Sequence, residues 1–380
     1  MTSIRLRAVG AMCLVVCLGL PAGAQAKPNK KVCADAPTGY ASCSSRVVTD
    51  AKGAPAATAA PAGYGPGDIR SAYTLGASNS TRTVAIVDAY DDPNAESDLA
   101  TYRSQYGLSP CTTANGCFRK VSQTGTTRYP RANSGWAEEI SLDIDMVSAT
   151  CPGCHILLVE ASNSSLANLG TAVNYAASQP GVAAISNSYG GSEFSSETSA
   201  PYADYYNHQG IAITVSSGDN GYGVEFPAAA STVTAVGGTS LRRDSSARGF
   251  SETAWAGAGS GCSAYVKKPT WQKDTGCARR TVADVSAVAD PNTGVAVYDT
   301  YRDGGWLVFG GTSVSSPIVG SVYAMGNPAG SPSQPYATPA GLFDVTSGSN
   351  GSCSPAYLCT AGAGFDGPTG LGTPNGTSAF

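Results

Sequence analysis

Histidine is almost absent from this 380-residue sequence, which contains only His155 and His208. Imidazole is the usual base for a serine or cysteine nucleophile. His155 begins an apolar run directly after a cysteine, and His208 lies just before another apolar run. We interpret both as structural residues. If the chain carries a nucleophile, its base has to be sought among the carboxylates.

Charged residues are also scarce. They make up 13% of the chain, the net charge is -4, and lysine and arginine form no cluster. Nucleic-acid-binding domains need basic patches, so we expect no nucleic acid partner. A membrane-spanning helix needs ~20 apolar residues, and no apolar run reaches that length, so we expect no membrane residence. The 42% hydrophobic content and the 46 glycines predict a compact core with many tight turns.

The first residues have the pattern of a secretory signal. Arg5 and Arg7 precede an apolar stretch, and residues 24–26 (Ala-Gln-Ala) supply the small-x-small cleavage site. We therefore expect residues 1–26 to be a signal peptide and the protein to be secreted. Residues 27–65 are rich in Ala, Pro, Gly, Ser and Thr and predict a short prosegment or flexible N-terminal extension. The ordered domain is then expected over residues 66–380.

Twelve cysteines are present, of which Cys13 and Cys17 lie in the signal segment. The other ten form sequence-near couples: Cys33 with Cys43, Cys111 with Cys117, Cys151 with Cys154, Cys262 with Cys277, and Cys353 with Cys359. An even number in an exported chain predicts disulfides, although sequence alone leaves their connectivity open. A redox or zinc role for the Cys151-x-x-Cys154 motif is the alternative, which the lack of a second ligand pair disfavours.

Uniformly apolar runs alternate with helix-like stretches along the chain. The runs are residues 83–87, 155–159, 182–185, 210–215 and 233–236. Buried parallel strands joined by helices explain this pattern best, so the predicted fold class is α/β, with a doubly wound, mostly parallel sheet flanked by helices. In such sheets the functional residues lie in loops beyond the carboxyl ends of the strands.

A candidate nucleophile, Ser313, lies in the string Gly-Gly-Thr-Ser-Val-Ser-Ser-Pro at residues 310–317. A serine at the head of a buried helix lies where free N–H groups and the helix dipole favour an oxyanion. Serine is also an ordinary helix cap, which is the alternative interpretation. The complete G-T-S-x-x-x-P string resembles the nucleophile motif shared by subtilisins and sedolisins. Neither histidine lies in the His-Gly-Thr context that subtilisins use.

Two carboxylates, Glu139 and Asp143, lie four residues apart on a helix predicted from about Ser134 to Ala149. Residues at this spacing share one helix face. A solvated acidic face is the alternative interpretation. Against it, no lysine or arginine lies between Ala132 and Ser148 to pair with these acids.

Together these motifs resemble the sedolisins, the serine-carboxyl peptidases built on a subtilisin-like fold. The resemblance implies that Glu139 is the general base for Ser313 and that Asp143 orients Glu139. Asp219, in the Ser-Gly-Asp-Asn-Gly loop at 217–221, would then be the oxyanion-hole acid. It also implies that Ser188, Tyr189 and Gly190 form the edge that pairs with the backbone of a protein or peptide substrate.

The implied mechanism sets a pH range. Only an ionised Glu139 can accept a proton, and only a protonated Asp219 can donate a hydrogen bond to the oxyanion. Free carboxylic acids titrate near ~4, so we expect endopeptidase activity at acidic pH and a raised pKa for Asp219.

Resemblance to the sedolisins also implies one structural Ca²⁺ near the C-terminus. Its ligands would be the carboxylates of Asp344 and Asp366 and the carbonyls of Val345, Gly362 and Gly364. Hard cations prefer such oxygen ligands. An acidic pair in a glycine loop is otherwise more often an ordinary turn.

Other interpretations stay open. An exported protein could retain this fold in a binding or structural role without activity. A serine esterase is disfavoured because no G-x-S-x-G motif is present. Asp88 could be a subtilisin-type aspartate, but without a matching histidine we interpret it as a helix-entry or loop residue. We expect a monomer.

Overall fold

A computed structural model describes residues 1–2, 26–78, 80–302, 304–326 and 330–380. The expected signal peptide lies almost entirely outside the described residues. The central sheet has the strand order β12-β11-β9-β7-β4-β6-β5, and β15 also pairs with β11. Apart from the antiparallel β11–β12 pair, its pairings are parallel. Its strands are β4 (Thr83–Ala89), β5 (Phe118–Ser122), β6 (His155–Ala161), β7 (Val182–Asn187), β9 (Ala212–Ser216), β11 (Thr234–Arg243), β12 (Phe250–Ala254) and β15 (Val285–Val288).

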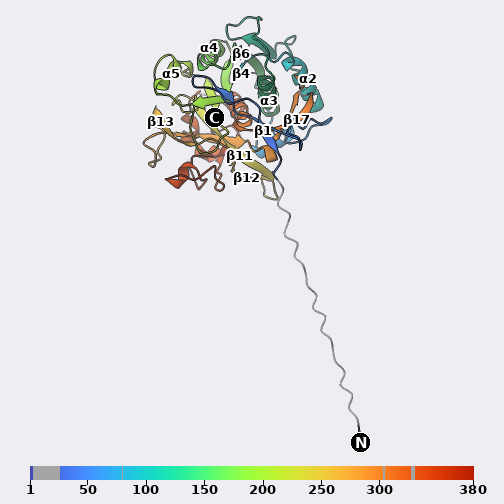
Figure 1. Cartoon of the computed structure of the whole chain (residues 1–380), viewed down its shortest axis with the longest axis vertical. Helices are drawn as coiled ribbons and strands as arrows, with labels where there is room; N and C mark the ends of the chain where they lie inside the picture. Colours follow the sequence, from blue (N-terminus) through green and yellow to red (C-terminus); the bar gives the residue numbers. More distant parts are fainter. Residues whose placement is uncertain (3–25, 79, 303, 327–329) are drawn as a thin grey trace.

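Helices cover both faces of this sheet (Figure 1). On one face lie α3 (Ser134–Thr150) and α6 (Thr312–Met325), and on the other lies α4 (Leu166–Ala177). Outside this layer, α1 (Pro66–Ala72) and α2 (Ala95–Gln105) pack against α3, and α5 (Tyr202–Tyr205) packs against α4. A short helix, α7 (Gln334–Ala337), follows α6 in the chain. Alternate side chains of a strand point to opposite faces. On β4, Ala85 and Val87 pack in the cluster that contains α4, whereas Val84 and Ile86 pack in the cluster that contains α3. This arrangement confirms the predicted α/β architecture.

Smaller sheets surround the central one. An antiparallel sheet has the order β1-β3-β17-β16 and another has the order β10-β8-β2, while β13–β14 and β18–β19 form two-stranded pairs. Their strands are β1 (Asn29–Lys31), β2 (Ser42–Cys43), β3 (Arg46–Val48), β8 (Tyr189–Ser192), β10 (Glu225–Phe226), β13 (Gly261–Lys267), β14 (Arg279–Val282), β16 (Val295–Asp299), β17 (Gly305–Gly310), β18 (Leu342–Phe343) and β19 (Thr373–Pro374). Within the described residues, no helix combines the length and the apolar character that crossing a membrane requires.

The expected start of ordered structure near Gly65 is wrong. Residues 29–48 form three strands, and the blue N-terminal strands lie beside the orange β17 in Figure 1. Val47, which is fully buried, pairs with Phe309 of β17. These strands are only two or three residues long and pair with distant segments, so their Ala- and Pro-rich surroundings gave no local strand signal.

The ten cysteines from Cys33 onward are all joined as disulfides, in the sequence-near couples named above. Cys151 and Cys154 are fully buried and bonded to each other. They therefore do not form a zinc site in this structure, and the interpretation of the motif as a staple is confirmed.

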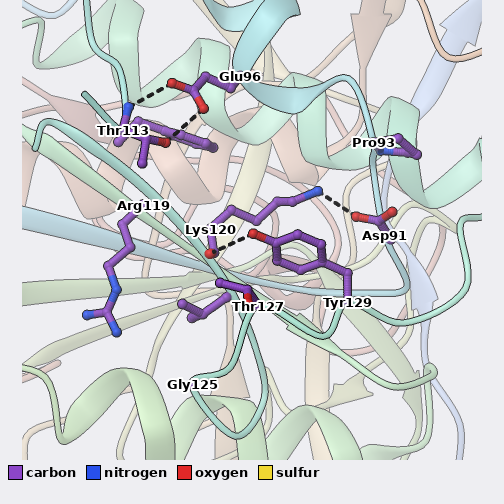
Figure 2. A pocket seen from close by; sticks show the side chains of 11 residues that line it. Asp91, Pro93, Glu96, Thr113, Arg119, Lys120, Gly125, Thr127 and Tyr129 are labelled. Atoms are coloured by element: carbon purple, nitrogen blue, oxygen red, sulfur yellow. Dashed lines mark hydrogen bonds and ion pairs between the residues drawn. The ribbon is translucent and has the colours of Figure 1, made fainter. Parts of the chain in front are cut away.

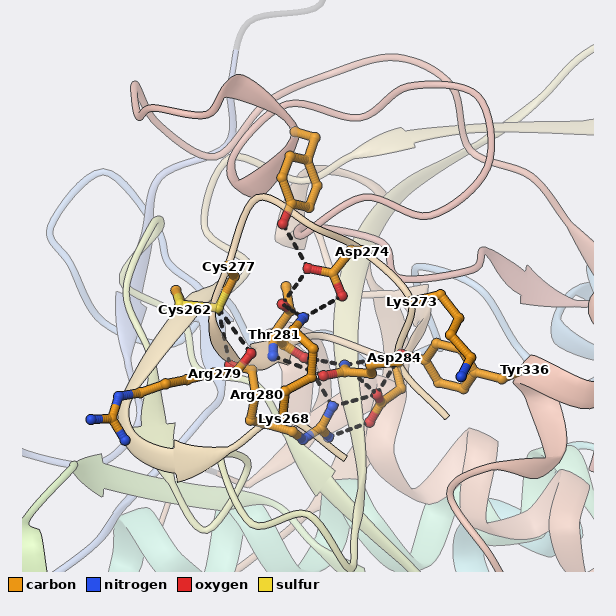
Figure 3. Close-up of polar contacts among 12 residues, drawn as sticks. Cys262, Lys268, Lys273, Asp274, Cys277, Arg279, Arg280, Thr281, Asp284 and Tyr336 are labelled. Carbon is orange, nitrogen blue, oxygen red and sulfur yellow. Dashed lines mark hydrogen bonds and ion pairs between the residues drawn. A yellow bond between two sulfur atoms is a disulfide. The ribbon is translucent and has the colours of Figure 1, made fainter. Parts of the chain in front are cut away.

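A buried ion pair fixes the turn between β14 and β15 (Figure 3). Arg280 and Asp284 are both fully buried, and the guanidinium donates to the two carboxylate oxygens at 2.6 and 2.5 Å. Asp284 also accepts the Ala235 N–H of β11 at 2.8 Å. Since buried charges need partners, this pair ties β15 to β11, and β15 in turn packs against α6.

Candidate active site

Helices α3 and α6 pack against each other on one face of the central sheet and bring the predicted catalytic side chains together. Ser313 is the second residue of α6 and is fully buried. Gly311 precedes the helix with φ +104°, a conformation that favours glycine. This sharp turn out of β17 places the Ser313 hydroxyl at the helix N-terminus, where N–H groups lack intrahelical partners.

Glu139 and Asp143 lie on α3 and are fully buried, so the alternative interpretation of a solvated acidic face is wrong. Burial raises the pKa of the Glu139 carboxyl well above its usual range, and the hydroxyls of Ser313 and Ser45, which lie beside it, act in the opposite direction. Neither hydroxyl forms a hydrogen bond with Glu139 in the described structure. The Ser313 Oγ instead donates to the Ser188 carbonyl at 3.1 Å. To bond Glu139, this hydroxyl would have to turn away from Ser188 O.

Asp143 is held by a residue that also contacts Ser313. Ser188 Oγ donates to Asp143 Oδ1 at 2.9 Å, and this bond slightly lowers the pKa of a carboxyl that burial raises well above its usual range. Burial raises the pKa of Glu139 in the same way, and the negative charge of Asp88 raises both pKa values further. Acids in one low-dielectric pocket cannot all be ionised.

Asp88 belongs to this carboxylate cluster, which corrects its interpretation as a loop residue. It is the sixth residue of β4, is fully buried, and neither carboxyl oxygen has a partner within the described residues. Burial raises the pKa of Asp88 to about 8. Two-residue alternation in the sequence puts Asp88 on the same strand face as Val84 and Ile86, and the structure shows that this face meets α3.

Asp219 lies in the loop after β9, at the carboxyl edge of the sheet. Its Oδ1 accepts the Thr312 N–H at 2.8 Å and the Thr312 hydroxyl at 3.0 Å. Its Oδ2 is buried and has no partner among the described residues. Burial raises the pKa of Asp219 to about 7, against the lowering effect of the Thr312 bonds. The predicted raised pKa therefore agrees with the structure.

The predicted substrate-binding residues follow β7. Ser188 contacts both Ser313 and Asp143, as described above. Tyr189 is fully buried, and its hydroxyl donates to Asn187 Oδ1 at 2.8 Å. With this side chain in the core, residues 189 and 190 offer only backbone at the sheet edge. That edge is paired with β2 in this structure.

The two histidines lie elsewhere. His155 is the first residue of β6, and His208 precedes β9, so both lie at the amino edge of the parallel strands. The His208 ring contacts Asn174 Oδ1 at 3.0 Å. The carboxylate cluster and Asp219 lie toward the opposite, carboxyl edge.

The five predicted calcium ligands lie in two neighbouring loops. Gly362 N–H donates to Asp366 Oδ2 at 3.0 Å, and Gly364 N–H donates to Asp344 Oδ2 at 2.9 Å. Asp366 is buried and Asp344 is exposed. Burial, together with the charge of Asp344, raises the pKa of Asp366 to about 7. In the described part of the chain, no three His, Cys, Asp or Glu side chains group as metal ligands, so such a site would depend on backbone oxygens.

A cavity of about 670 Å³ lies away from these residues (Figure 2). Lys120 and Asp91 form an ion pair at 2.5 Å at its wall, and Tyr129 OH donates to the Lys120 carbonyl. None of the predicted catalytic residues lines it.

The fold and these side chains define a subtilisin-like α/β protein with a serine–carboxylate site. Residues 137–339 match the subtilase family. The chain is 31% identical to kumamolisin of Bacillus sp. (strain MN-32), over 84% of this chain and 63% of that protein. It is 34% identical to sedolisin of Pseudomonas sp. (strain 101), over 43% of this chain and 33% of that protein. The chain thus spans less than two thirds of either relative.

A solved structure gives the same assignment. Pseudomonas sedolisin, described as a serine-carboxyl proteinase in complex with two molecules of pseudo-iodotyrostatin, superposes with a TM-score of 0.70. It is 29% identical, over 84% of this chain and 96% of that chain. The chain belongs to the subtilase family and, within it, to the sedolisins.

Proposed function

We propose that this protein is a secreted, monomeric serine-carboxyl endopeptidase that hydrolyses proteins or peptides at acidic pH. The observation that carries the proposal is the convergence of Ser313 with Glu139 and Asp143 in one buried pocket, with Asp219 on the other side of α6's first turn. Titratable groups with strongly raised pKa values that share a pocket are typical of catalytic sites.

In the proposed reaction, Ser313 Oγ attacks the substrate carbonyl and its proton passes to Glu139. The Ser313 N–H and a protonated Asp219 stabilise the oxyanion. Asp143, held by Ser188, positions Glu139. Glu139 then gives the proton to the leaving amine, and water hydrolyses the acyl-enzyme by the reverse proton path.

The experiment is cleavage of a peptide library between about pH 3 and 8, which brackets the titration of ordinary and raised carboxyls. We expect Ser313→Ala to lose activity by a factor on the order of 10⁶. Ser321→Ala is a matched control, because Ser321 lies on the same helix, is equally buried, and has no hydrogen-bond partner for its hydroxyl in the described structure. Equal activity of the two variants, or an optimum near pH 8, contradicts the proposal.

We also propose one structural Ca²⁺ held by Asp344 and Asp366 with the carbonyls of Val345, Gly362 and Gly364. The residues fit such an ion, because the two acids lie in neighbouring loops, and burial together with the charge of Asp344 raises the cost of ionising Asp366. A bound divalent cation would remove that cost.

The test of the ion is thermal unfolding with and without a calcium chelator. Chelation should lower the melting temperature of the wild type by several degrees, since ligand binding adds RT ln(1 + [L]/Kd) to stability. Asp366→Asn should abolish the response. A wild type that is insensitive to chelation and free of calcium by metal analysis overturns the assignment.

A further inference from the structure

Thr312 is the residue directly before the nucleophile, and the proposed reaction does not use its side chain. It is the first residue of α6 and is fully buried. Its hydroxyl lies where the helix meets the loop after β9. There Thr312 Oγ1 accepts the Gly218 N–H at 3.1 Å, and it lies 3.0 Å from Asp219 Oδ1 and 3.2 Å from Gly218 O. One hydroxyl thus contacts both the oxyanion-hole candidate and the residue before it.

The hydrogen bonds around Thr312 Oγ1 leave its proton one preferred direction. A hydroxyl has one proton to donate, whereas a backbone N–H can only donate. The Gly218 N–H therefore occupies a lone pair of Oγ1, and the proton points to Gly218 O or to Asp219 Oδ1. The Gly218 carbonyl already accepts the Gly259 N–H at 2.8 Å, and Asp219 Oδ1 is the nearer oxygen. The hydroxyl is thus the second donor to Oδ1, beside the Thr312 N–H at 2.8 Å.

The methyl group of Thr312 fixes this direction. A β-branched side chain is stiff at χ1. The Thr312 methyl carbon lies where β11 has a glycine, because a β-carbon added to Gly238 would lie only 3.3 Å from it. With the methyl group facing β11, the hydroxyl stays on the side of Asp219.

Two donors on Oδ1 decide which oxygen of a protonated Asp219 carries the proton. In a carboxylic acid the carbonyl oxygen accepts hydrogen bonds better than the oxygen that bears the proton. Because Oδ1 accepts two bonds, the acid form places its proton on Oδ2. Oδ2 is buried and has no partner among the described residues.

Oδ2 also faces the place where an oxyanion would form. The Ser313 N–H, which is the other oxyanion donor in the proposed reaction, donates to the Ser44 carbonyl at 2.8 Å. A β-carbon added to Gly311 would lie within 2.5 Å of both that carbonyl oxygen and Asp219 Oδ2. Asp219 Oδ2 and an oxygen bound by the Ser313 N–H therefore lie around the same point.

We propose that Thr312 is a positioning residue: its N–H and its hydroxyl hold Asp219 Oδ1 and keep the acid proton on Oδ2, directed at the substrate oxyanion. The inference rests on the proposed function. No bond to Thr312 forms or breaks in the reaction. Because the hydroxyl acts through Asp219, its removal should change what Asp219 does and not only the stability of the loop.

The same hydroxyl influences the ionisation of Asp219. Burial raises the pKa of Asp219 to about 7, and the bonds from Thr312 lower it, because donors favour the charged carboxylate. Other charged groups also act here: Glu225 of β10 raises the pKa of Asp219, Arg46 of β3 lowers it, and the charge of Asp219 raises the pKa of Glu139 on α3. Removal of the hydroxyl leaves these groups in place, so it should raise the pKa of Asp219.

The test compares Thr312→Val with the wild type by kcat and KM for a peptide substrate between about pH 3 and 9. Valine keeps the shape and the backbone N–H but removes the hydroxyl. We expect the maximal kcat to fall about tenfold, less than the factor on the order of 10²–10³ for loss of an oxyanion donor, with little change in KM. The alkaline limb of the profile should move to higher pH. A purely structural role would instead lower kcat by the same factor at every pH.

Thr312→Ser is the conservative variant, because it keeps the hydroxyl. It should keep the wild-type alkaline limb, and its kcat should exceed that of Thr312→Val. Thr234→Val is the matched control: Thr234 is also buried and its hydroxyl bonds the Tyr323 hydroxyl at 3.0 Å, but it begins β11 at the opposite, amino edge of the sheet. This control should change neither kcat nor the profile. Thermal unfolding shows which variants fold, and Thr312→Ala carries the same prediction if the valine variant does not.

A double variant separates an effect through Asp219 from any other. Asparagine does not titrate, so in the Asp219→Asn background Thr312→Val should cause no shift of the pH profile. Three results overturn the inference and leave the proposed function standing: an alkaline limb that Thr312→Val does not move, a shift that persists in Asp219→Asn, or an equal shift in Thr312→Ser. A wild type without peptidase activity refutes the proposed function itself.

Discussion

The sharpest test of the proposed mechanism is the replacement of Asp219 by asparagine and by alanine. Asp219 Oδ1 is already engaged by Thr312, so only Oδ2 can serve a substrate oxyanion. As a carboxylic acid, Asp219 donates from Oδ2 only while protonated. The amide of asparagine would still accept the Thr312 bonds and would donate from the same position at every pH. Alanine would do neither.

The magnitude follows from the raised pKa of about 7. Near pH 9 such a group is roughly 1% protonated, so the wild-type kcat should be about 100-fold below its acidic plateau from this cause alone. The Asp219→Asn variant should lack this alkaline loss. Removing one oxyanion donor typically costs a factor on the order of 10²–10³ in kcat, so Asp219→Ala should lose that much at its optimum.

The assay is kcat between about pH 3 and 9, because kcat reports groups in the enzyme–substrate complex. A bound peptide keeps Asp219 buried there, as β2 does in this structure. The reasoning is refuted if the asparagine variant loses activity above pH 7 with the wild-type midpoint, or if the alanine variant matches the wild type. Either result would show that Asp219 does not donate to the transition state.

Three further predictions concern the base, the pH dependence of stability and the buried ion pair. Glu139→Gln should lower kcat by a factor on the order of 10² or more with little change in KM, whereas Glu96→Gln on the surface of α2 should change neither. The unfolding free energy of the inactive Ser313→Ala variant should fall as pH rises from about 4 through about 7. The reason is that folded-state acids with raised pKa values bind protons more tightly than the unfolded chain does. A free energy that rises over this range in denaturant titrations would contradict the raised pKa values. Arg280→Ala should cost about 3–5 kcal/mol in the same titrations by leaving a buried charge unpaired, while Arg279→Ala, at the exposed neighbouring position, should cost under about 1 kcal/mol.

The strands of the central sheet could be predicted where they are buried on both faces. The apolar runs at residues 83–87, 155–159 and 182–185 form β4, β6 and β7, and each strand continues for two further residues, the first of which is polar. β5 was missed because it is an edge strand that contains Arg119 and Lys120, so it shows no uniform apolar run. The order of the strands depends on pairings between distant segments, which no local pattern records.

The candidate site residues could likewise be predicted only where a local sequence pattern indicates them. The helix that carries Glu139 and Asp143 begins at Ser134 and ends one residue beyond its predicted end, and the i, i+4 spacing correctly predicted a shared face. Asp88 was missed because its role depends on which face of β4 meets α3. The strand β2 was missed for a similar reason, because it is two residues long and is defined only by its pairing with β8.

Within the proposed mechanism, the clustering of carboxyls explains how a site without histidine can avoid separating charge. When histidine accepts a serine proton, a new ion pair forms from neutral groups. The proposed mechanism requires one negative charge on the cluster of Glu139, Asp143 and Asp88, and burial, which raises all three pKa values, opposes the ionisation of more than one of them. Proton transfer to Glu139 only moves this charge to the substrate oxygen, toward the N-terminus of α6, the Ser313 N–H and the acid of Asp219. The pocket keeps a constant net charge throughout, so deep burial costs the transition state no more than it costs the resting site.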